Sequence, residues 1–116
     1  MSESILNSIK KKLGYDAEYT SFDPDIIMAI NGVFNVLTQL GVGPKEGFSI
    51  SDASATWESY TSDVNLNMAK EYMFMKVKII FDPPQSTHAM NAYTEMIKEY
   101  ECRLNYQVDP GEVPNE

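Results

Sequence analysis

The sequence is poor in the residues that build catalytic and metal sites. It has one cysteine, Cys102, and one histidine, His88, among 116 residues. A single cysteine excludes an intrachain disulfide framework, and one histidine with one cysteine does not provide a recognisable zinc site. Cys102 also lacks a neighbouring base, because about 14 residues of predicted helix, or about 20 Å, separate it from His88. We therefore expect no metal, no cofactor and no enzymatic activity.

Basic residues are scarce as well. The chain has 9 Lys and Arg against 17 Asp and Glu, for a formal net charge of -8. The run Lys10–Lys12 makes the N-terminal segment locally basic, so the remainder from Tyr15 is more acidic than the total indicates. Affinity for nucleic acid comes largely from Lys and Arg that displace counterions from phosphates. We expect no tight binding to duplex DNA, and we interpret the lysine run as a solvated helix end whose charge also suits pairing between copies.

Long apolar runs and nucleotide-binding motifs are absent from the sequence. No segment approaches the ~20 apolar residues of a membrane span, and the N-terminal "MSESILNSIKKKLG" has no apolar core of a signal peptide. The stretch "GVGPKEG" has the glycine content of a phosphate loop, but no strand precedes it and a proline interrupts it. We predict a soluble chain with a helical domain over residues 1–105 and an extended or disordered tail over 106–116.

Apolar periodicity predicts an all-α fold of about four main helices. In the first helix Ser2 or Ser4 is the predicted N-cap, and Gly14 is the left-handed stop. In the second, Asp23 is the predicted N-cap before Pro24, and Gly41 ends the helix. Gly32 inside the second helix costs about 1 kcal/mol against alanine, which predicts that a neighbouring backbone approaches it closely.

A long connection over residues 41–63 separates the second and third helices. Loops beyond about 12 to 15 residues are uncommon in compact domains unless they are functional or structured. Phe48 and Ile50 alternate like a short strand, and "SATWESY" has the pattern of one helical turn. The sequence predicts a structured loop with either a short β-hairpin or a single helical turn.

The third predicted helix, about residues 65–81, has apolar residues on two sides. One stripe contains Leu66, Ala69, Met73, Val77 and Ile80, and the other contains Met68, Tyr72, Met75 and Ile79. This pattern predicts a helix packed on both sides. Pro83 and Pro84 then end it, and Ser86 or Thr87 starts a last helix, on which Glu99 and Arg103 pair at four-residue spacing.

A small domain has few helices with which to cover both sides of one of its own. We therefore predict that the second stripe faces an adjacent subunit, together with aromatic residues of the long loop. The predicted interface consists of Trp57, Tyr60, Met68, Tyr72, Met75 and Ile79. The alternative is a small regulatory module that binds a peptide or ligand in this Met- and Tyr-lined groove.

Several segments resemble the head-tail connector (adaptor) proteins of tailed bacteriophages. The resemblance covers about residues 5–105, and "QLGVG", "FSISD", Trp57, "FDPP" and "EYECRLN" are its most specific parts. It implies a helical virion structural protein without catalytic residues, made in the cytoplasm of a bacterial host. It further implies a ring, typically dodecameric, that binds the portal protein, extends the DNA channel without sequence-specific contacts and docks a stopper or tail-completion protein.

Overall fold

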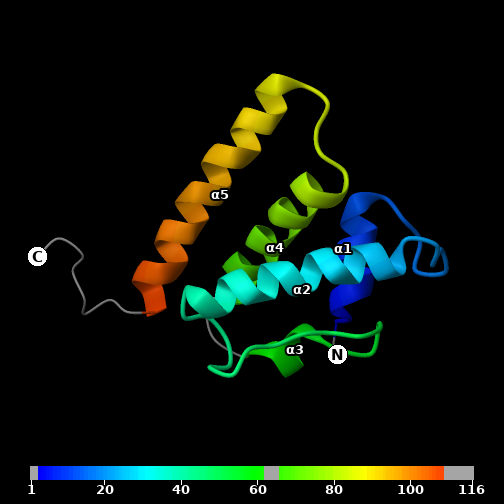
Figure 1. Cartoon of the computed structure of the whole chain (residues 1–116), viewed down its shortest axis with the longest axis horizontal. Coiled ribbons are helices and arrows are strands. Elements are labelled where there is room, and N and C mark those ends of the chain that lie inside the picture. Colours follow the sequence, from blue (N-terminus) through cyan, green and yellow to red (C-terminus); the bar gives the residue numbers. More distant parts are fainter. Residues whose placement is uncertain (1–2, 62–65, 109–116) are drawn as a thin grey trace, which may run out of the picture.

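The computed structural model describes residues 3–61 and 66–108, which contain five helices and no strand. In chain order they are α1 (Ile5–Leu13), α2 (Asp23–Gln39), α3 (Trp57–Tyr60), α4 (Leu66–Phe81) and α5 (Thr87–Val108) (Figure 1). Four of them are the predicted main helices, and α3 is the helical turn predicted in the long loop. The prediction of an all-α fold is confirmed.

Helix α4 lies at the centre of the fold. It packs against α2 on one side and α5 on another, while α1 contacts both α2 and α4 (Figure 1). Its buried residues come from both predicted stripes: Ala69, Tyr72, Met73, Met75 and Val77. A helix with this pattern is expected to be covered on two sides, and here the same chain provides both covers. The prediction of a helix packed on both sides is confirmed.

Helix α1 begins and ends where its sequence indicates. The Ser4 side chain accepts a hydrogen bond from the Asn7 backbone N–H, and Gly14 adopts φ 97° as its left-handed C-cap. Lys10, in the last turn of α1, was predicted to be solvated, but its exposed fraction is only 1%. Its ammonium lies 2.9 Å from Asp23 Oδ1 and donates to the Ala17 carbonyl at 3.0 Å. Lys10 thus fixes the α1–α2 loop from inside.

The start of α2 differs from the prediction in its N-cap residue. Asp23 is the first helical residue and not the N-cap, since Phe22 occupies the cap position and makes no side-chain capping bond. The Asp23 carboxylate pairs with Lys10 instead of capping backbone N–H groups. Its negative charge still lies in the first turn, together with Asp25, where the helix dipole favours it.

The loop between α2 and α3 contains no strand, so the β-hairpin alternative is wrong. The Asn31 side-chain amide of α2 donates to the Ile50 carbonyl at 2.9 Å and accepts from the Ile50 N–H at 2.8 Å. A side chain therefore satisfies the backbone groups that a second strand would have paired. Thr56 and Ser59 then form a capping box around the α3 turn.

The two prolines at 83 and 84 follow the end of α4 as predicted, and Ser86 accepts from the Ala89 N–H at the start of α5. Glu99 and Arg103 form the predicted ion pair at 2.6 Å. Helix α5 continues to Val108, so residues 106–108 are helical where a tail was predicted. The rest of that predicted tail lies outside the described residues.

Candidate interaction surfaces

Four of the six predicted interface residues lie in the core of the chain. Their exposed fractions are Trp57 1%, Tyr60 3%, Tyr72 0% and Met75 3%. Met68 and Ile79 are half-buried and pack against the same core. The premise behind the predicted interface, that α4 has more apolar surface than its own chain can cover, is therefore wrong for these residues. Helix α5 is long enough to cover the second stripe.

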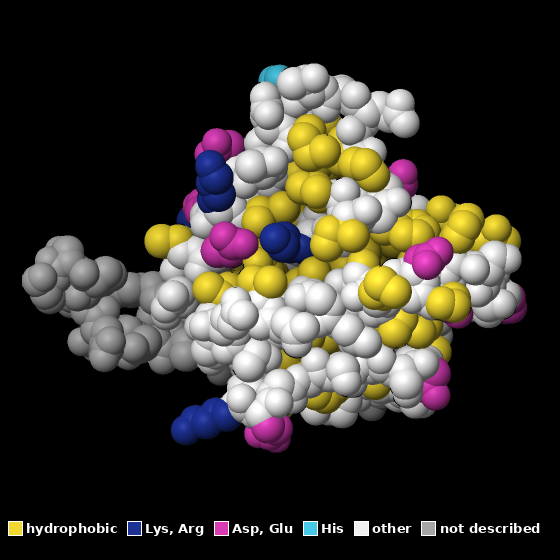
Figure 2. Space-filling view, in the orientation of Figure 1, with side chains coloured by type: hydrophobic (Ala, Val, Ile, Leu, Met, Phe, Trp, Pro, Cys, Tyr) yellow, Lys and Arg dark blue, Asp and Glu magenta, His cyan; other side chains and the backbone are white. Residues whose placement is uncertain are grey.

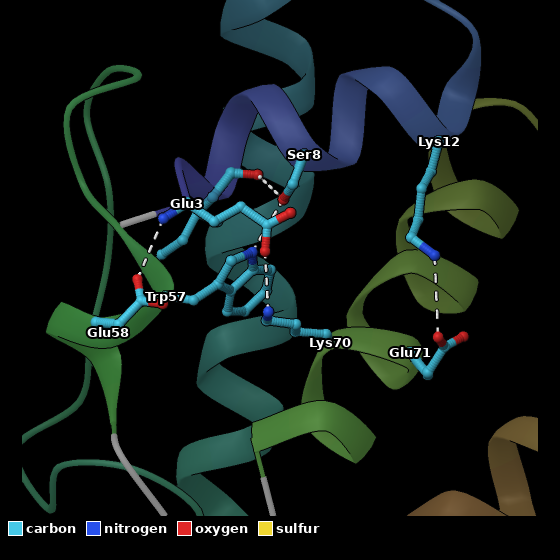
Figure 3. A network of polar contacts seen from close by, with 8 residues as sticks. Glu3, Ser8, Lys12, Trp57, Glu58, Lys70 and Glu71 are labelled. Carbon is cyan, nitrogen blue, oxygen red and sulfur yellow. Dashed lines mark hydrogen bonds and ion pairs between the residues drawn. The ribbon is translucent and has the colours of Figure 1, made fainter. Parts of the chain in front are cut away.

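The polar groups of these buried aromatic residues have partners within the chain. The Trp57 indole N–H donates to Ser8 Oγ at 2.9 Å, as Figure 3 shows, and the Tyr60 hydroxyl donates to the Val42 carbonyl at 3.3 Å. The Tyr72 hydroxyl donates to Glu101 at 2.7 Å. Burial raises the pKa of both tyrosines, and the Glu101 carboxylate raises the pKa of Tyr72 further.

A polar network holds the N-terminal segment against α3 and α4 (Figure 3). The Glu3 backbone N–H donates to Glu58 Oε1 at 3.2 Å, and the Glu3 carboxylate accepts from Lys70 at 2.9 Å. The Lys70 ammonium also lies 5.8 Å from the centre of the Trp57 ring. This end of the molecule is therefore occupied by intrachain contacts.

An open apolar hollow of about 390 Å³ lies between α2 and α4. The α2–α4 hollow is lined by Asp25, Met28, Ala29, Gly32, Ile80 and Phe81. Met28 is 73% exposed and Ile80 is 58% exposed, although Ile80 was predicted to share a core stripe. The predicted close approach of a backbone to Gly32 is wrong within the chain, because nothing lies within 4 Å of where its Cβ would be.

An aromatic cluster extends this hollow toward the α1–α2 loop. Its members are Tyr15, Tyr19, Phe22 and Phe81. Phe81 joins the two features, since it lines the hollow and its ring centre is 5.6 Å from that of Phe22. Tyr19 and Phe22 are 45% and 38% exposed. Figure 2 shows apolar side chains gathered over this end of the molecule, at the right of the view.

A second apolar hollow, of about 320 Å³, lies on another flank of α4, against α5. The α4–α5 hollow is lined by Glu71, Phe74, Met75, Ala89, Ala92, Tyr93 and Met96. Met96 is 45% exposed, and the small side chains Ala89 and Ala92 line the hollow together with Phe74. Lys12 lies at its edge, 5.5 Å from the Phe74 ring centre and 3.8 Å from Glu71 (Figure 3).

Of the six predicted residues, Met75 alone lines one of these two hollows. The sequence did not indicate the other residues that line the hollows, because the prediction was based on the apolar stripes, and these stripes form the core. The available signal was an off-stripe pair on α2, Met28 and Gly32, whose four-residue spacing places both on the exposed face of that helix. Tyr72 is fully buried and does not line the alternative Met- and Tyr-lined groove, whereas Met75, Tyr93 and Met96 line the α4–α5 hollow.

The described residues provide no cluster of side chains that could bind a metal ion. Within residues 3–61 and 66–108 no three His, Cys, Asp or Glu side chains are arranged to hold a metal ion. Cys102 is exposed, as is His88. In the same part of the chain, none of the helices combines the length and apolar character that a membrane crossing requires.

Comparison with known protein families shows to which family the chain belongs. A family model described as phage connector protein matches residues 5–111. No curated protein and no solved structure gives a significant match. The match spans nearly all of the sequence, including every helix described above, and it confirms the family predicted from the sequence. The chain therefore belongs to the phage connector protein family, which gives it a structural, connecting role in a bacteriophage.

Proposed function

We propose that this chain is a head-tail connector that assembles as a closed ring beneath the portal. In this role it extends the DNA channel and docks the stopper or tail-completion protein on its far side. Twelve copies are the expected number, by analogy with the family resemblance. The proposal assigns no enzymatic step, since the chain acts through its surfaces alone.

The observation that supports a ring is the exposed apolar end of the molecule, which the α2–α4 hollow and the aromatic cluster form together. Among the residues whose side chains the structure describes, five large apolar side chains are more than a third exposed, and four of them lie there: Tyr19, Phe22, Met28 and Ile80. Contiguous exposed apolar surface of this kind is typical of protein interaction sites. In a connector, the available partners are identical copies and the proteins on either side.

The charge of the chain supports a channel through which DNA passes. Each copy carries a formal charge of -8. Phosphates are bound by Lys and Arg that release counterions, so an acidic wall repels the duplex and does not retain it. The passage of DNA then needs no sequence-specific contact.

The test is imaging of the purified chain alone and with the portal protein of the same phage. We expect closed rings by electron microscopy and native mass spectrometry, at high concentration or when the portal is present to template them. A chain that stays monomeric at high concentration and does not bind the portal would overturn the proposal.

A further inference from the structure

The two hollows are different surfaces of one molecule, and both use α4. The α2–α4 hollow takes Ile80 and Phe81 from the end of that helix, whereas the α4–α5 hollow takes Glu71, Phe74 and Met75 from its first half and middle. A ring closed by rotation needs two different surfaces on each copy, because its contacts run head to tail. A symmetric dimer would need only one surface that pairs with itself.

The shapes of the two surfaces fit such a contact. The absent side chain of Gly32 leaves the α2–α4 hollow open at α2, at a cost in helix propensity that no intrachain contact explains. Met96 is half exposed on the other surface, and an unbranched methionine adapts to an irregular apolar gap. These features leave room for a neighbouring molecule to approach Gly32 closely, which no described residue of the chain does.

A cation at the edge of one surface and a carboxylate at the edge of the other can also pair, with Glu71 as the competing partner of the cation within the chain. Asp25 lines the α2–α4 hollow, and the structure shows no ion pair for it within the described residues. Lys12 borders the α4–α5 hollow, with its side chain 48% exposed and its ion pair to Glu71 long at 3.8 Å. An exposed ion pair adds little affinity, but it selects orientation and register.

We propose that the α2–α4 hollow of one copy packs on the α4–α5 hollow of the next copy. Met96 of one molecule enters the hollow beside Gly32 of its neighbour, and Lys12 approaches Asp25. This contact rests on the proposed ring, and it specifies which two surfaces form each junction.

The first experiment uses two variants that each damage one surface. Met28→Glu disrupts the α2–α4 hollow and Met96→Glu disrupts the α4–α5 hollow, and both positions are exposed, so the helical fold is retained by circular dichroism. Each variant alone stays monomeric under conditions where the unmodified chain forms rings. An equimolar mixture gives a one-to-one heterodimer by native mass spectrometry, because each variant keeps the surface that the other lacks.

Crosslinking covers the case in which rings form only on the portal. In a Cys102→Ala background, Met28→Cys and Met96→Cys copies are mixed at high concentration with a short bismaleimide. We expect at least tenfold more crosslinked dimer in the mixture than with either variant alone. Equal yields in all three samples, or no dimer in the mixture, overturn the contact.

A third variant separates assembly from folding. Gly32→Gln places a side chain in the α2–α4 hollow where nothing lies within 4 Å, so the monomer keeps or gains thermal stability while self-association falls at least tenfold. Asn35→Gln, at an exposed α2 position that does not line the hollow, is the matched control and assembles normally.

The outcomes distinguish this contact from the proposed function. If the glutamate variants and Gly32→Gln form rings like the unmodified chain, the junction lies elsewhere and the connector role stands. If the unmodified chain forms no ring with or without the portal, the proposed function itself fails.

Discussion

The hydroxyl of Tyr72 on α4 donates a 2.7 Å hydrogen bond to the Glu101 carboxylate on α5. Tyr72 is fully buried, and Lys76 lies 4.0 Å from the same carboxylate oxygen. Among the helices, α5 packs mainly on α4, and only Ile97 and Leu104 of its described side chains are buried hydrophobics. This hydrogen bond is therefore an important contact that holds the last helix on the domain.

Tyr72→Phe should destabilise the domain by about 1 kcal/mol, measured by urea denaturation. The ring and its packing remain, but the hydrogen bond to a charged acceptor is lost. Glu101 is partly exposed and recovers water, which keeps the loss moderate. Tyr93→Phe is the control, because the structure shows no hydrogen bond for that half-buried hydroxyl among the described residues. Equal losses in both variants would contradict the assigned role.

The stability of the domain should fall as the pH rises above 10. Burial raises the pKa of Tyr60 and of Tyr72 above the ordinary value of 10.0, so both stay protonated in the fold while the unfolded chain ionises. Their contribution is complete below pH 10 and is lost above it, by up to about 1.4 kcal/mol per pH unit for each tyrosine. Alkaline denaturation curves check this, and Tyr72→Phe should flatten the decline. If stability declines with pH as steeply in Tyr72→Phe as in the unmodified chain, Tyr72 does not contribute to the decline.

Replacing Asp23 of the Lys10–Asp23 ion pair should destabilise the domain more than replacing Lys10. Asp23→Asn leaves the ammonium of Lys10, which is 1% exposed, without its counterion. This should lower the free energy of unfolding by about 3 kcal/mol. Lys10→Met leaves a partly exposed carboxylate at a helix start, where the dipole favours it, and should cost about 2 kcal/mol. The double variant should recover part of the loss in a double-mutant cycle by thermal denaturation. Strict additivity would show that the two groups are not coupled.

Gly43→Ala should destabilise the loop that precedes α3. Gly43 has φ +83°, and a Cβ there would lie 2.5 Å from a Tyr60 ring carbon. The strained backbone and the clash together should cost about 2 to 4 kcal/mol. Gly14→Ala has a similar φ of +97° with nothing within 4 Å, so it isolates the backbone effect at about 1 kcal/mol. Similar losses at both positions by urea denaturation would exclude the clash.

The sequence by itself determined which segments are helical and several of their ends, although not the cap of α2 or the end of α5. Ser4, Gly14 and the prolines after α4 act on backbone groups within a few residues of themselves, and their effects do not depend on the rest of the fold. The apolar periodicity of α4 likewise indicated that two of its sides are covered. These features are local, so one sequence is enough to read them.

Only the tertiary structure decided which element covers which side. Periodicity shows that Tyr72 and Met75 share a face, but it does not show that α5 of the same chain lies over them. The burial of Lys10, the Asn31 contact that replaces a strand, and the exposure of Met28 beside Ile80 depend in the same way on segments distant in sequence. Such contacts are set by how whole helices pack against one another, and no local pattern carries that information.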